Sequence, residues 1–218
     1  MRTLIFLIVG TLLSSCATTS PRDAMQQDVD QATSIIQRFE SIPEKGIPPA
    51  VMRAAKGVAI LTVTKAGFIG SGRSGTGVVV ERLDKGWSGP SAIGTGGVGF
   101  GFQAGVEVTE FVMVLNTPAA VDAFAKQGNV TLGGNLSVAA GPVGRTAEAG
   151  VGLQSAIYTY SISQGFFGGV SLEGTVVSTR DEANEAYYGR KVTAEEILSG
   201  KVPAPAGARN LLAALSKY

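Results

Sequence analysis

Glycine is concentrated in the middle of this chain, and its placement limits the folds that the chain can adopt. Of the 30 glycines, 25 lie between residues 57 and 174, among short β-branched runs such as VAILTV (58–63) and FVMVL (111–115). Such runs are typical of strands, and a glycine inside a strand marks a bend or the close approach of another backbone. The pattern predicts a strongly curved, mainly antiparallel sheet, either barrel-like or a sandwich.

Helical patterns flank this region on both sides. Residues 23–40 repeat apolar side chains at spacings of four and three, which predicts an amphipathic helix. Capping signals predict short helices over 50–56, from Thr117 to about 128, over 181–189, from Thr193 to 198 and near 209–216. The expected fold class is therefore α+β, with N- and C-terminal helices around the sheet. The first helix has an acidic polar face, which favours docking on the sheet over lying in a membrane interface.

The N-terminus has the composition of a secretory signal. Arg2 precedes an apolar run at 4–9, and small residues precede Cys16, the single cysteine of the chain. The run is too short to span a bilayer, and a cysteine at this place resembles a lipobox. We expect a lipoprotein signal peptide over 1–15, a lipidated Cys16 with a tether to residue 23, and one domain over 24–218. Ala17 after the cysteine points to the periplasmic face of a bacterial outer membrane. An ordinary secreted protein is the alternative.

Charge and residue usage exclude several functions. The net charge is +1 and histidine is absent, so an overall basic surface for nucleic acid is not expected and the most frequent general base is missing. We therefore expect no catalysis, no metal and no cofactor. Residues 70–75 (GSGRSG) satisfy a dinucleotide-binding glycine pattern, but such a pattern needs a helix directly after it. A strand pattern follows instead, which favours a glycine-rich hairpin.

Several ordered motifs resemble the SYLF domain. They are GWSGPS (86–91), GFGFQAGVE (99–107), AAGPVG (139–144), SQGFFGGVSLEG (163–174), NEAYYG (184–189) and VTAEEILSG (192–200). The resemblance covers roughly residues 30–205. It implies a lipid-binding module, since eukaryotic members bind phosphoinositides, in some cases with actin, and bacterial members are mostly lipoproteins. It supplies no catalytic residues.

Basic residues gather in the segment 53–85, whose local charge is +4. If the strands bring these side chains to one face, they attract anionic lipid head groups, and neighbouring aromatic residues supply an apolar contact. The candidate ligand-binding residues are Lys56, Lys65, Arg73, Arg82, Lys85, Phe68 and Trp87. The alternative is that the charges form a solvated rim and that Trp87 belongs to the core.

Two acidic residues, Glu107 and Glu173, lie inside glycine-rich strand motifs. Brought together, they could bind a cation or form an acid/base pair, but each is more simply a partner for backbone N–H groups or a basic residue. The sequence thus favours a non-enzymatic, lipid-binding lipoprotein of the bacterial envelope, attached by its acyl anchor and recognising anionic phospholipid. The alternative is a structural or protein-interaction module of the envelope with a protein partner and no lipid ligand.

Overall fold

The computed structural model describes residues 19–42, 46–67, 70–100, 105–126, 129–133, 136–142, 155–165 and 175–218. Its elements run in the order α1 (Pro21–Glu40), α2 (Pro49–Ala54), β1 (Gly57–Gly67), β2 (Gly70–Leu83), β3 (Gly86–Trp87), β4 (Ser91–Phe100), β5 (Gly105–Leu115), α3 (Pro118–Lys126), β6 (Asn129–Thr131), β7 (Val138–Ala140), β8 (Ile157–Gly165), β9 (Val176–Thr179), α4 (Asp181–Tyr188), α5 (Ala194–Leu198), the 3-10 turn η2 (Ala206–Ala208) and α6 (Arg209–Leu215).

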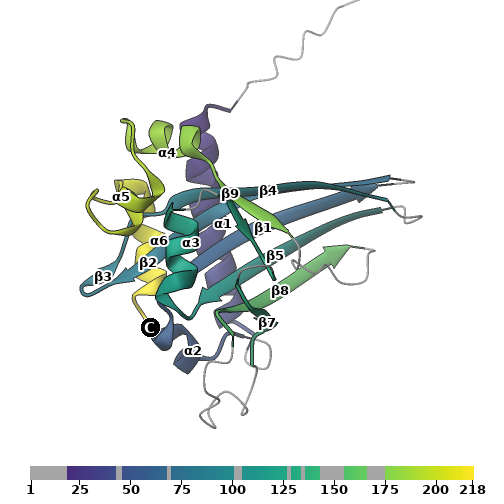
Figure 1. The fold of residues 1–218 in the computed structure, drawn as a ribbon, viewed down its shortest axis with the longest axis horizontal. Helices are drawn as coiled ribbons and strands as arrows, with labels where there is room; N and C mark the ends of the chain where they lie inside the picture. The colour runs from purple at the N-terminus through teal and green to yellow at the C-terminus, as the bar shows by residue number, and fades with distance from the viewer. Residues whose placement is uncertain are drawn as a thin grey trace, which may run out of the picture.

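The strands form one curled sheet of nine strands, in the order β6-β9-β4-β2-β1-β5-β8-β7, with β3 paired to β2. Every pairing is antiparallel except that of β7 with β8. The long strands β1, β2, β4 and β5 run beyond the helices to one side of the molecule (Figure 1). The predicted α+β class with a curved, mainly antiparallel sheet is confirmed.

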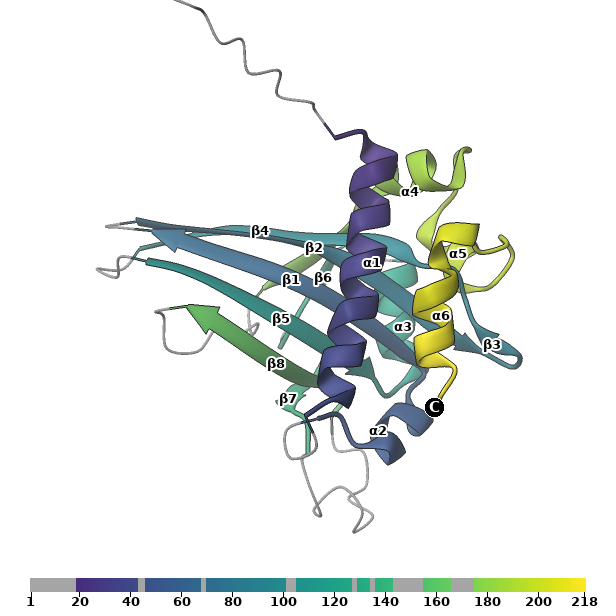
Figure 2. The ribbon, with the colours of Figure 1, turned by 180° about the vertical axis from the view of Figure 1, so that it is seen from behind.

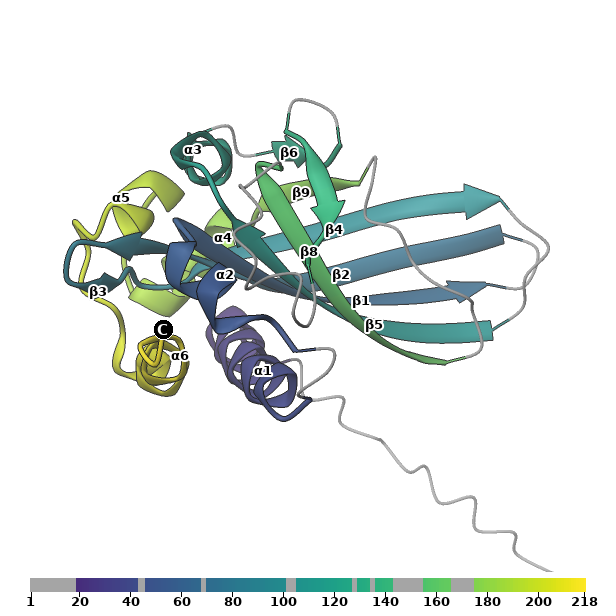
Figure 3. The same ribbon diagram turned by 90° about the horizontal axis from the view of Figure 1, so that it is seen from below.

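Side chains alternate between two faces of this sheet, and each face has its own core. On the α1 face, strand residues such as Val58, Ile60 and Val112 pack with α1 and α6. On the α3 face, residues such as Leu61 and Phe111 pack with α3. Figures 2 and 3 show α1 and α6 on one side of the sheet and α3 on the other. The helix predicted over 23–40 therefore docks on the sheet, as its acidic polar face indicated.

Local signals account for the helix ends. Ser20 accepts a hydrogen bond from the Asp23 N–H at the start of α1, and the capping box of Thr193 and Glu196 begins α5. Gly189 ends α4 with a φ of 70°, a conformation that favours glycine.

A second position, Gly77, requires glycine because the backbone of the neighbouring strand β1 lies very close to it. A Cβ at this position would overlap the carbonyl oxygen of Ile60 on the neighbouring strand. The strands β1 and β2 therefore approach closely where the sheet curls, as glycine within a strand predicted.

Candidate functional site

The basic residues predicted as a ligand-binding group divide into two sets at opposite ends of β1 and β2. Lys65 lies directly opposite Arg73 near the hairpin that joins the two strands. Arg82 and Lys85 lie at the other end, where the Arg82 N–H bonds the carbonyl oxygen of Lys56. Arg82 follows Arg73 by nine positions along β2, a distance of about 30 Å. The chain does not assemble them into one cationic patch, and Phe68 lies outside the described residues.

Arg82 is engaged in holding the fold together. Its guanidinium donates hydrogen bonds of 2.9 Å to the carbonyl oxygens of Ala55 and Met52 at the end of α2. It also lies 4.1 Å from the ring centroid of Trp87, which is 8% exposed. Burial lowers the pKa of the Arg82 guanidinium. Trp87 therefore belongs to the hydrophobic core, which was the alternative to a lipid-binding role for this residue.

Lys65 and Arg73 share the α3 face with a buried carboxylate. Glu107 is the partner of Lys65 on the other side of β1, and it is only 1% exposed. Its Oε1 accepts a hydrogen bond of 3.4 Å from the Thr109 hydroxyl, while its Oε2 has no hydrogen-bond partner among the described residues. The hypothesis that Glu107 and Glu173 form a cation site or an acid/base pair involves Glu173, which lies outside the described residues. In the described ranges no three Asp, Glu, Cys or His side chains gather as a metal site would require.

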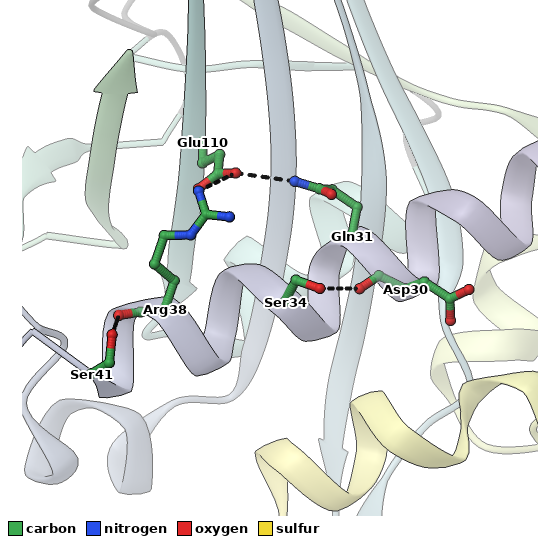
Figure 4. Close-up of polar contacts among 6 residues, drawn as sticks. All are labelled: Asp30, Gln31, Ser34, Arg38, Ser41 and Glu110. Carbon is green, nitrogen blue, oxygen red and sulfur yellow. Dashed lines mark hydrogen bonds and ion pairs between the residues drawn. The ribbon is translucent and has the colours of Figure 1, made fainter.

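Sequence reasoning missed a polar cluster on the α1 face. Glu110 on β5 is 5% exposed and lies opposite Thr62 of β1. Arg38 of α1 donates two hydrogen bonds to it, of 2.7 and 2.9 Å, and Gln31 donates a third of 3.0 Å (Figure 4). The amphipathic pattern of α1 placed Arg38 away from the apolar stripe, and nothing in the sequence showed which carboxylate it would meet. This cluster holds the C-terminal half of α1 against β5.

A second polar contact holds the other half of α1. Asp28 accepts a hydrogen bond of 2.6 Å from the Thr76 hydroxyl on β2. Its other oxygen accepts a charged hydrogen bond of 2.5 Å from Arg180, which precedes α4. The α1 helix is therefore fixed to the sheet at two points, with apolar packing between them.

A groove lies between these two points, along the side of α1. Its volume is about 240 Å³. It is lined by polar side chains of the helix, by apolar side chains below them and by strand residues at its floor: Gln27, Asp28, Gln31, Ala32, Ile35, Ile60, Thr62, Thr76 and Gly77. The Thr62 hydroxyl oxygen is buried there and has no hydrogen-bond partner among the described residues.

Two exposed valines lie on the same face of the sheet as this groove. Val106 is 57% exposed and Val108 is 36% exposed, and both project from β5 on the α1 face, beyond the helix. Valine side chains facing water on a sheet lose the stabilisation that burial would give them. Groove and valines together form a surface suited to contact with another macromolecule, so they are the candidate functional site.

Comparison with known proteins decides the family. The sequence model of a family described as "Ysc84: Las17-binding protein actin regulator" matches residues 96–218. The chain belongs to the Ysc84 family. The predicted SYLF resemblance is thereby confirmed, since the SYLF domain is the domain that this family model describes.

Relatives from yeasts and human agree with this assignment. An SH3 domain-containing protein of Schizosaccharomyces pombe is 53% identical over 78% of this chain and 41% of its own length. The SH3 domain-containing YSC84-like protein 1 of Homo sapiens is 47% identical over 89% of this chain and 59% of its own length. Protein YSC84 of Saccharomyces cerevisiae is 53% identical over 76% of this chain and 36% of its own length. The chain thus spans less than two thirds of the length of these Ysc84-family relatives.

These relatives correct the functional hypothesis drawn from the sequence. They are eukaryotic proteins of an actin-regulator family, so the hypothesis of a lipid-binding lipoprotein at the periplasmic face of a bacterial outer membrane is wrong. The partners expected from it, an acyl anchor with anionic head groups, are wrong with it. The hypothesis depended on a short apolar run before Cys16, and both lie outside the described residues. Within the part of the chain that the structure describes, no helix is long and apolar enough to cross a membrane.

Proposed function

We propose that this chain is a non-enzymatic, protein-binding domain that takes part in the regulation of actin. The observation that carries the proposal is membership of a family described as Las17-binding and actin-regulating, with relatives 47–53% identical over most of the chain. Because the chain spans only part of those relatives, the proposal concerns the shared domain.

The structure supports a binding role through the surface that it leaves open. Val106 and Val108 expose apolar side chains on the same face of the sheet as the groove, and neighbouring exposed apolar side chains are a feature of protein-interaction surfaces. The charged side chains near the site are already paired: Glu110 with Arg38, and Asp28 with Arg180. Both ion pairs hold α1 in place, so these charged side chains already have a structural role.

Direct binding measurements with purified proteins test this function. The whole chain would be sedimented with actin filaments, and its binding to immobilised Las17 would be measured in parallel. We expect saturable binding to at least one of the two, and none to an unrelated protein coupled to the same matrix. Absence of binding to both actin and Las17 would overturn the proposed function.

A further inference from the structure

We draw no further inference here: the strongest candidate, the carboxylate of Glu107 buried on the α3 face of the sheet with no hydrogen-bond partner for its Oε2 among the described residues, carries nothing, because nothing in the part of the chain that the structure describes shows what ligand would meet this oxygen.

Discussion

Arg38 and Glu110, 72 positions apart in the sequence, form a two-pronged ion pair that fastens α1 to β5. The carboxylate is almost fully buried, with 7% of the side chain exposed, whereas 38% of the Arg38 side chain reaches solvent. The two partners are therefore not equivalent. Loss of the arginine leaves a buried anion, and loss of the carboxylate leaves a cation that can turn to water.

This asymmetry predicts how the free energy of unfolding changes when Arg38 is removed alone and when the charge of Glu110 is removed with it. Arg38→Ala should lower the free energy of unfolding by about 2–3 kcal/mol, because the Glu110 carboxylate keeps only the Gln31 hydrogen bond. Adding Glu110→Gln to that variant should recover part of the loss, since the buried charge is then gone. Urea denaturation measures both. Lys126→Ala, which removes an exposed pair with Asp122, is the control and should leave the free energy of unfolding close to that of the parent. Equal losses for Arg38→Ala and Lys126→Ala would contradict the account.

The close approach of β1 to β2 predicts that alanine changes protein stability differently at two glycines of β2. Gly77→Ala should cost about 1–3 kcal/mol, because the new methyl group would overlap the Ile60 carbonyl oxygen. Gly72→Ala meets no atom within 4 Å and should be neutral or stabilise by up to about 1 kcal/mol through the unfolded chain. Thermal and urea unfolding of the two variants give the comparison. A Gly77→Ala protein as stable as the parent would show that the strands can separate there at no cost.

The orphan hydroxyl of Thr62 predicts a stabilising substitution. Thr62→Val removes a buried oxygen that has no partner among the described residues and should raise the free energy of unfolding by about 0.5–2 kcal/mol. Thr95→Val is the matched change in another strand, where the hydroxyl donates a 2.8 Å hydrogen bond to the Val176 carbonyl oxygen. That variant should lose about 1 kcal/mol. Opposite signs in equilibrium denaturation are the expected result, and two losses of similar size would refute the orphan assignment.

Buried tyrosines predict a loss of stability in alkali. Burial raises the pKa of Tyr187 to about 12, and the Tyr187 hydroxyl donates a 3.1 Å hydrogen bond to Gln26. Above pH 10 the unfolded chain releases this proton while the folded chain keeps it, so the stabilisation present below pH 10 falls as the pH rises toward 12. Each such tyrosine contributes a slope of about 1.4 kcal/mol per pH unit. Tyr187→Phe should therefore flatten the decline of urea-measured stability between pH 10 and pH 12, and an unchanged slope would argue against a buried, protonated Tyr187.

Local signals in the sequence were sufficient to place the helices of this fold. The capping box of Thr193 and Glu196, the terminal Gly189 and the four-three spacing along α1 each act within a few residues, and the helices begin and end close to where those signals lie. The clustering of glycine among β-branched runs was enough for a curved sheet, because bends and close approaches are properties of the strand itself.

The candidate site depended on information that local signals do not carry. The basic segment 53–85 is compact in sequence, but it forms a hairpin of two long strands, so Arg73 and Arg82 end about 30 Å apart. Lys65 and Arg73 lie directly opposite each other because they are nearly equally far along the chain from the connection between β1 and β2. Val106 and Val108 look like core residues in the sequence, since only the position of α1 determines which strand rows stay uncovered.

A fluorophore beside the exposed valines of β5 tests the central claim, that this surface binds a protein partner, most directly. Val108→Cys, in a chain whose single native cysteine is replaced by Cys16→Ser, would be labelled with a polarity-sensitive dye and titrated with actin filaments and with Las17. The account predicts that the emission shifts to the blue as the bound partner covers position 108, with no shift for the same dye at Val176→Cys. Partner binding that leaves the emission at position 108 unchanged would contradict it.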